Sequence, residues 1–220
     1  MKALLIRDFI NYKNLAFAIL ILIPIGYITT LPPFWISLGL LLPVVVISIY
    51  FSEKRSRIDR FMISLPIRRY DILASRYITL ASIWVFTVVY QFAIGHLVQN
   101  FIPYDVYTFS WKEFVALLSI GFVVLAFHIP LYSLISSFVL ATSIFCALYL
   151  FSFWFMLDTL VTMSGMTTTI IFNELDRWII PFLEKKISFL PYVVLPFLSV
   201  SIYYVSLKIV GKAFSAKELI

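Results

Sequence analysis

Residues 14–52 read NLAFAILILIPIGYITTLPPFWISLGLLLPVVVISIYFS and contain no Asp, Glu, Lys or Arg. A helix needs about 20 mostly apolar residues to cross the hydrocarbon core of a membrane, so a charge-free run of this length can hold two helices. Pro32 and Pro33 lie near its middle, and proline both lacks a donor N–H and disfavours helix in the preceding residue. The run therefore predicts two membrane-spanning helices joined by a short turn.

Three more charge-free runs of membrane length follow, at residues 77–104, 114–157 and 187–207. The second is again long enough for two helices, and the segment ending at Pro130 is the turn candidate near its middle. The prediction is an all-α, polytopic membrane protein, with residues 1–220 forming one transmembrane domain. It has a cytoplasmic loop at 52–76, an outer cap at 159–186, and six spans at about 15–29, 34–51, 77–98, 114–129, 133–157 and 187–210.

The composition excludes a soluble globular domain. Hydrophobic residues make up 62% of the chain and charged residues 13%, whereas soluble domains carry about 25% charged residues. The net charge of +6 does not indicate a nucleic-acid partner, because membrane-length apolar segments separate the basic residues. Membrane lipid is the expected partner of these charges. Cys146 is the single cysteine, which excludes an internal disulfide and argues against a cysteine-based metal site.

The distribution of Lys and Arg predicts the orientation, since cytoplasmic loops retain positive charge. Thirteen of the 17 basic residues fall in the first 13 residues, the 52–76 loop and the last 13 residues. The other four are Lys112, Arg177, Lys185 and Lys186. We therefore expect a multi-pass protein of the plasma membrane with both termini in the cytoplasm.

Residues 1–13 are predicted to form an interfacial amphipathic helix before the first span. At about 100° per residue, apolar side chains share one face and polar side chains lie opposite. The apolar face comprises Leu5, Ile6, Phe9, Ile10 and Tyr12, and the polar face Arg7, Asp8 and Asn11. A basic cytoplasmic start without this helix is the alternative.

The 52–76 loop contains a second short amphipathic pattern, which ends at Pro66. One face has the i, i+3, i+4, i+7 spacing of a helix, with Ile58, Phe61, Met62 and Leu65, and the other side carries Arg57, Asp59, Arg60 and Ser64. No cytoplasmic domain of the chain covers this apolar stripe. The stripe is therefore expected to pack either on lipid and neighbouring helices or on another protein. The helical periodicity alone does not decide between these two alternatives.

The same loop reads Glu53-Lys54 and, after a spacer, SLPIRRYDILASRY at residues 64–77. This pattern resembles the first cytoplasmic loop of the ABC-2 type permeases, the transmembrane subunits of bacterial ATP-binding-cassette exporters. Glu53, Pro66, Arg69 and Arg76 take positions of the family pattern. The chain most resembles a branch that includes exporters of phenol-soluble modulins and antimicrobial peptides. Residues 135–138 lack the Gly and basic residues that many relatives have between the fourth and fifth spans, so a second cytoplasmic contact is not implied.

The resemblance implies that residues 56–65 form a coupling helix seated in a groove of an ATP-hydrolysing subunit. The implied docking residues are Arg57, Ile58, Asp59, Arg60, Phe61, Met62 and Leu65. Two ATPase subunits, which bind the ATP and Mg, and a second permease, identical or different, are the implied partners. This chain would then be no enzyme and hold no cofactor. Its substrate would be amphipathic or hydrophobic, with a peptide the first choice and a lipid, antimicrobial peptide or antibiotic the alternatives; no substrate-binding residue is indicated.

An intramembrane protease and an ion-coupled transporter are the competing classes. The nearest serine motif, at Ser164, lacks a Gly two positions earlier, and His96 and His128 fall on different predicted spans. No ATP-binding Gly-x-x-x-x-Gly-Lys motif occurs. No ionisable residue lies in the middle of a predicted span, where ion-coupled transporters usually place them. Gln91 is the strongest polar residue there and is predicted to be an interhelical hydrogen-bond partner.

Overall fold

The computed structural model describes residues 7–8, 12–56, 68–101, 110–165, 176–187 and 190–216. Within these ranges the regular elements are helices. The long ones are α2 (Lys13–Ile28), α3 (Leu42–Ser56), α5 (Arg69–Val98), α6 (Trp111–Leu134), α7 (Phe138–Ser164) and α10 (Pro191–Ala216). A π-helical segment, η1 (Trp35–Leu41), continues into α3, and the short η2 (Asp176–Trp178) continues into α9 (Ile179–Lys186).

Five helices in the described ranges are long and apolar enough to cross a membrane. They are η1 with α3 over Trp35–Arg55, and α5, α6, α7 and α10. Helix α2 has 16 residues, which corresponds to about 24 Å, against a hydrocarbon core of about 30 Å. The described helices agree with the predicted all-α, polytopic class, whereas the sixth span, predicted at 15–29, stays a prediction.

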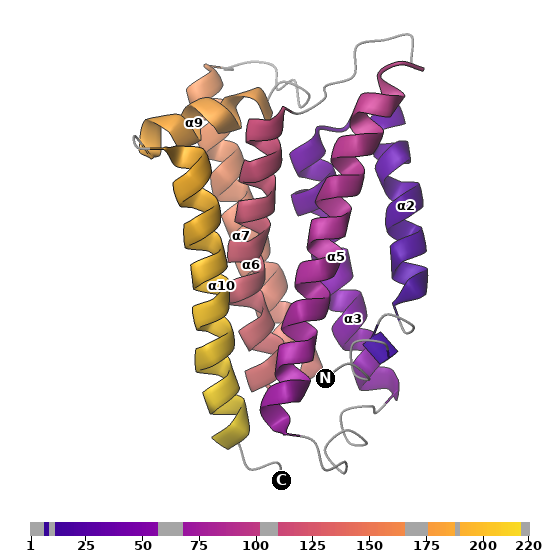
Figure 1. Ribbon diagram of the computed structural model, residues 1–220, viewed down its shortest axis with the longest axis vertical. Helices are drawn as coiled ribbons and strands as arrows, with labels where there is room; N and C mark the ends of the chain where they lie inside the picture. Colours follow the sequence, from indigo (N-terminus) through magenta and orange to yellow (C-terminus); the bar gives the residue numbers. More distant parts are fainter. Residues whose placement is uncertain are drawn as a thin grey trace.

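The long helices lie side by side along one axis (Figure 1). One end of the bundle contains the end of α3, the start of α5 and the end of α10, while α9 crosses the opposite end beside α10. We call the first the loop end, because the predicted coupling loop connects α3 to α5 there, and the second the cap end. Helix α10 packs against α6 and α5, and α2 packs against α5.

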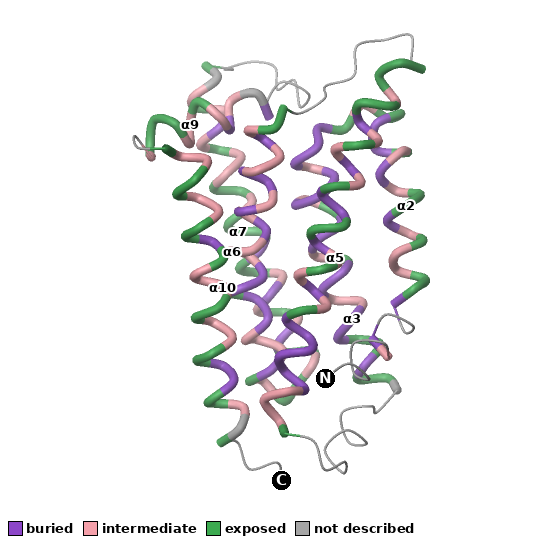
Figure 2. Tube along the Cα trace, viewed as in Figure 1, coloured by how far each residue is buried: buried purple, intermediate pink, exposed green. Residues whose placement is uncertain are grey.

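Burial separates the helices into an inner and an outer group. Buried residues are frequent along η1, α3, α5 and α6, while α7 and α10 are mostly exposed or half-buried (Figure 2). The exposed side chains of α7 and α10 are large and apolar, for example Phe151 and Phe197. These two helices therefore present an apolar outer surface of the kind that faces lipid.

The turn between α6 and α7 lies later than the sequence predicted. Helix α6 runs through Pro130 to Leu134 and α7 begins at Phe138, whereas the expected spans ended at 129 and resumed at 133. Proline removes the hydrogen bond to the carbonyl four residues earlier, here that of Ala126. The Ser206 hydroxyl of α10 donates to this oxygen at 2.6 Å. A bond from another helix replaces the lost one, and α6 continues.

Pro24 in α2 is accommodated in the same way. The carbonyl that it leaves without its helical partner is that of Leu20, and Tyr90 of α5 donates its hydroxyl to that oxygen at 3.0 Å. About one turn after Pro24, the Tyr27 hydroxyl of α2 donates to the Gln91 carbonyl of α5 at 3.1 Å. These bonds fix α2 against α5.

Two further helices extend beyond the predicted spans. Helix α5 begins at Arg69, so its first two turns precede the span predicted at 77–98 and lie within the 52–76 segment. Helix α7 continues to Ser164, into the predicted outer cap, and ends where Gly165 adopts a left-handed φ of 68°. Polar turns extend both helices beyond the charge-free runs that set the predicted limits. The length of a charge-free run therefore shows where the chain crosses the membrane, but it does not show where the helix begins and ends.

The predicted interfacial helix at 1–13 lies mostly outside the described residues. Residues 7 and 8 are helical, and the Tyr12 amide donates to the Asp8 carbonyl at 3.0 Å. Asp8 is 1% exposed, although the prediction placed it on a polar face. The Thr79 hydroxyl of α5 donates to its carboxylate at 3.2 Å, and Arg7 pairs with the same group. These partners compensate the burial of the Asp8 charge.

Candidate functional site

The predicted docking residues lie outside the described residues. They are Arg57, Ile58, Asp59, Arg60, Phe61, Met62 and Leu65, and Pro66 also lies there. The structure describes both flanks of this loop, with Glu53 in the last turn of α3 and Arg69 and Arg76 in the first turns of α5. The candidate site is built from these two helix ends.

Glu53 and Arg76 form an ion pair inside the loop end of the bundle. Arg76 Nη2 lies 3.0 Å from Glu53 Oε2, and the two side chains are 6% and 4% exposed. The Arg76 guanidinium also lies 5.9 Å from the centre of the Tyr50 ring. Burying one charge is costly unless an opposite charge compensates it, so each of these residues depends on the other. The pair thus fixes the end of α3 against the start of α5.

Helical periodicity explains why these charges point inward. Arg76 shares a face of α5 with Leu73 and Leu80, and both are buried. Glu53 lies one turn beyond the buried Tyr50 on α3. A charged residue within the apolar face of a helix is expected to have a buried partner of opposite charge. Here the two apolar faces, one on α3 and one on α5, lie on either side of the same loop.

The segment before α2 joins the same cluster. The Tyr12 hydroxyl donates to Glu53 Oε1 at 3.1 Å. Burial, reinforced by the Glu53 and Asp8 charges, raises the pKa of Tyr12, so its phenol stays protonated and remains a donor. Thr79 holds Asp8 against α5. We call Asp8, Tyr12, Glu53, Arg76 and Thr79 the loop-end cluster, and it joins the segment before α2, the end of α3 and the start of α5.

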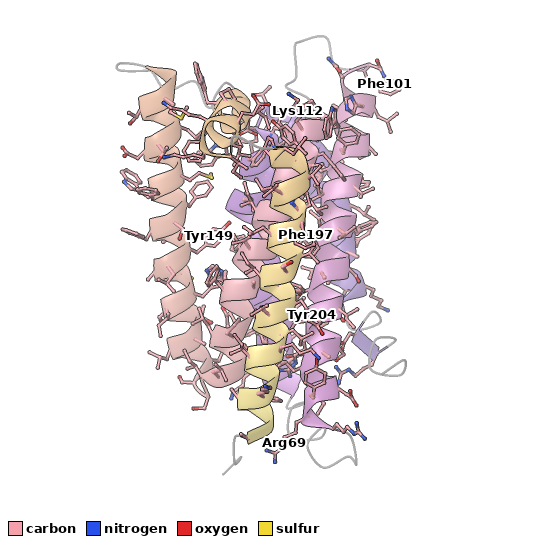
Figure 3. The ribbon with its side chains drawn as sticks, turned by 60° about the vertical axis from the view of Figure 1, so that its left-hand side comes forward. Arg69, Phe101, Lys112, Tyr149, Phe197 and Tyr204 are labelled. Carbon is pink, nitrogen blue, oxygen red and sulfur yellow. The ribbon has the colours of Figure 1, made fainter. Side chains whose placement is uncertain are left out.

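Arg69 has a different position from the other predicted pattern residues. It begins α5 and is half-buried at the end of the bundle, two turns before Arg76 (Figure 3). The structure therefore brings together Glu53 and Arg76 of the predicted pattern, while Arg69 lies at the point where the chain leaves the loop. Tyr12 and Asp8 were not predicted as site residues.

Another buried carboxyl, that of Asp176, lies at the cap end. Its side chain is 1% exposed, and its Oδ2 accepts a hydrogen bond from the Phe34 amide at 2.8 Å. Phe34 lies in the first turn of the helix that continues as η1, where amides have no partner within the helix and Pro33 supplies no donor. Oδ1 has no hydrogen-bond partner among the described residues. Asp176 therefore caps a helix that is distant in the sequence.

Burial raises the pKa of Asp176 from 3.8 to about 8; the Phe34 amide opposes this shift and the nearby Glu113 charge adds to it. The folded chain then keeps a proton that the unfolded chain releases, so this group makes the fold less stable as the pH rises from about 4 to about 8. The sequence prediction missed this residue because it placed Asp176 in an amphipathic surface cap. The sequence did contain one indication of such a residue. The helix that starts at Pro32 and Pro33 has no capping side chain directly before it, so a cap from elsewhere in the chain could be expected.

Gln91 connects α5 to the start of η1 near the cap end. It is fully buried, its Nε2 donates to the Pro33 carbonyl at 2.9 Å, and the Ser37 hydroxyl bonds to its Oε1. The predicted role of Gln91 as an interhelical hydrogen-bond partner is confirmed.

Residues 3–214 match the model of a family described as ABC-2 family transporter protein. This match covers nearly the whole chain. The chain belongs to this family. Comparison with curated proteins and with solved structures gives no match. Proteins of the ABC-2 transporter family are membrane subunits that associate with ABC ATPases in general and typically lack an ATP site of their own.

This ABC-2 family protein holds its two histidines in structural contacts. His128 of α6 has Nδ1 2.6 Å from the Val124 carbonyl and its ring against Phe145, and His96 of α5 packs against Phe92. Among the described residues, no group of three His, Cys, Asp or Glu side chains could hold a metal ion. The loop-end cluster is therefore the candidate site for the transporter's function.

Proposed function

We propose that this chain is the permease subunit of an ATP-driven exporter that moves an amphipathic or hydrophobic substrate, with a peptide as the first choice, out of the cell. Two ATPase subunits bind the ATP and Mg and dock on the coupling helix at residues 56–65. A second permease subunit, identical or different, completes the pathway, because six helices leave little room for a central route. The protein lies in the plasma membrane with both termini in the cytoplasm.

The loop-end cluster is the observation that carries this proposal. An ATPase docked on the loop can move the membrane helices only if both ends of the loop are firmly attached to them. Glu53 before the loop and Arg76 after it are joined by the 3.0 Å buried ion pair, and Tyr12 bonds to the same carboxylate. A displacement of the loop is therefore passed to α3, α5 and the segment before α2 together.

The position of the charges also favours this class over ion-coupled transport. Within the described helices of membrane length, Asp, Glu, Lys and Arg lie in the first or last three turns, and none lies in the central part. Ion-coupled transporters usually place ionisable groups inside their spans. An ATP-driven permease receives its energy through the loop and needs no such groups.

The docking step is tested with Arg60→Glu combined with Phe61→Ala. The matched control, Lys185→Glu with Phe182→Ala in α9, also reverses one charge and removes one ring, but at the cap end. We expect the loop variant to retain about tenfold less of the ATPase, because a buried anchor and its charged neighbours dominate such interfaces. The ATPase is identified and quantified by mass spectrometry of the gently solubilised complex. Undiminished recovery by a normally inserted loop variant would reject the docking role.

The substrate is tested by reconstituting the permease with its ATPase in vesicles. ATP hydrolysis should rise when an amphipathic peptide is added, because a substrate changes turnover only if it binds one conformation better than another. A response to phospholipid or antibiotic instead of peptide would favour the alternative substrates. The permease by itself should neither hydrolyse ATP nor cleave peptides. Proteolysis that Ser164→Ala abolishes would show an intramembrane protease.

A further inference from the structure

A groove between α5 and α10 is open on the outside of the bundle. It has a volume of about 570 Å³ and extends from the middle of the two helices toward the loop end. Its lining includes Ile78, Ala81, Val85 and Phe86 of α5 and Tyr203 and Leu207 of α10. Figure 3 shows the two helices side by side, with Tyr204 of α10 next to α5.

The floor of this groove is closed by hydrogen bonds between the helices. The Tyr203 hydroxyl donates to the Tyr77 carbonyl at 2.6 Å, and the hydroxyls of Tyr77 and Ser206 are 2.9 Å apart. These bonds occupy the polar atoms of the floor, so the groove presents mainly apolar surface. A chain of methylene groups suits such a lining, whereas an extended peptide would place backbone donors and acceptors there without partners.

Lys208 lies at the loop-end mouth of the groove, directly after the lining residue Leu207. Its Nζ is 5.6 Å from the centre of the Tyr70 ring and 5.3 Å from that of Tyr204. Tyr70 can approach α10 closely because Gly211 has no side chain, and a Cβ there would lie 2.7 Å from the ring. The two rings hold the exposed ammonium in place by cation–π contacts, and none of the ion pairs within the described residues involves Lys208.

We propose that this groove binds an anionic phospholipid, with one acyl chain along the apolar lining and the phosphate at Lys208. Acyl chains gain little by moving from bilayer to an equally apolar groove, so the choice between lipids comes from the headgroup. Basic side chains between membrane helices near the cytoplasmic surface attract anionic headgroups. Lys212, one turn further along α10, is also exposed and adds to the positive charge at this mouth. The inference depends on neither the ATPase partner nor the exported substrate.

The full-length chain is reconstituted in nanodiscs that contain equal amounts of phosphatidylglycerol and phosphatidylcholine. After transfer to mild detergent, native mass spectrometry measures the lipids that remain bound. The wild type should retain phosphatidylglycerol in preference. Lys208→Gln should lower that preference about fivefold, which is the effect expected of one positive side chain at the membrane surface. The matched control is Lys186→Gln, which removes an exposed Lys at the cap end and should leave the preference unchanged.

The apolar half of the site is tested by filling it. Ala81→Phe places a ring in the groove and should reduce the total lipid retained, whereas Val139→Phe adds bulk on the 73% exposed outer side of α7 and should not. Lys208→Gln alters an exposed side chain, so it decides the question even if Ala81→Phe fails to fold. Equal lipid preference in wild type and Lys208→Gln would overturn the proposal. So would a disulfide-linked dimer through Ser82→Cys in a cysteine-free background, which would place a second copy in the groove.

Discussion

Replacement of Glu53 by Gln tests whether the buried ion pair holds the loop end together. The substitution keeps the shape of the side chain and its ability to accept the Tyr12 hydroxyl, and it removes the negative charge. Arg76, whose side chain is 6% exposed, then lacks the carboxylate that compensates its charge. Breaking a buried pair in this way costs about 3–5 kcal/mol. For a chain of this size we therefore expect the melting temperature to fall by about 6–20 °C.

The chain supplies a matched control at the cap end. Glu184 accepts a hydrogen bond from Lys112 at the same separation of 3.0 Å, but these two side chains are 44% and 43% exposed. Water and salt screen the charges there, so Glu184→Gln should change the melting temperature far less. Both variants are measured by tryptophan fluorescence during heating in detergent. Equal shifts would refute the argument that burial makes the Glu53–Arg76 pair essential.

Removal of both charges separates stability from coupling. Glu53→Gln combined with Arg76→Met leaves no uncompensated charge of the pair, so most of the lost stability should return. The attraction between α3 and α5 is then absent. If the pair passes loop movement to the helices, the double variant should still retain the ATPase, but its hydrolysis should respond weakly to substrate. A response equal to that of the wild type would show that the pair contributes stability without coupling.

Three further predictions concern the cap end, helix packing and topology. Asp176→Asn should remove a pH dependence of up to about 1.4 kcal/mol per pH unit between about pH 4 and about pH 8, so thermal scans at pH 6 and pH 8 should differ less for the variant than for the wild type. Gly121→Ala places a Cβ in steric overlap with the Trp84 ring, whose indole N–H is held by the Leu118 carbonyl, and should lower stability by about 1–3 kcal/mol in the same scans. Single cysteines at Ser56 and Thr168, in a cysteine-free background, should react with an impermeant reagent from opposite sides of the membrane, and labelling of both from outside would contradict the predicted orientation.

The positions of the long helices could be predicted because the membrane fixes how many apolar residues a span needs. The turn after α6 could not be predicted in the same way. Pro130 reads locally as a helix break, and the hydroxyl that compensates for it belongs to Ser206 on another helix. A sequence pattern shows the bond that proline removes, but it does not show which distant side chain will replace it.

The candidate site was predictable in part for a similar reason. Glu53 and Arg76 stand out as charges on apolar stripes beside one loop, and the family pattern includes both. Asp8 and Asp176 read as surface charges, because each lies directly beside an arginine in its own amphipathic segment. Each is buried by a partner far along the chain, Thr79 for Asp8 and the Phe34 amide for Asp176. Burial of a single charge is decided by the assembled bundle rather than by its neighbours in the sequence.

Helix α5 is the element best placed to carry movement from the loop to the rest of the protein. Hydrogen bonds or ion pairs connect it to five other elements. Arg76 pairs with α3, Tyr90 bonds to α2, and Gln91 bonds to Ser37 of η1. Trp84 bonds to α6, and the Tyr77 carbonyl accepts a hydrogen bond from α10. Helix α5 has 30 residues without an interior proline, which corresponds to a length of about 45 Å. A helix of this kind resists bending, so a tilt imposed at Arg69 reaches the cap end. Under the proposed function, an ATPase that moves the loop shifts α5 as a rod, and its hydrogen-bonded neighbours follow.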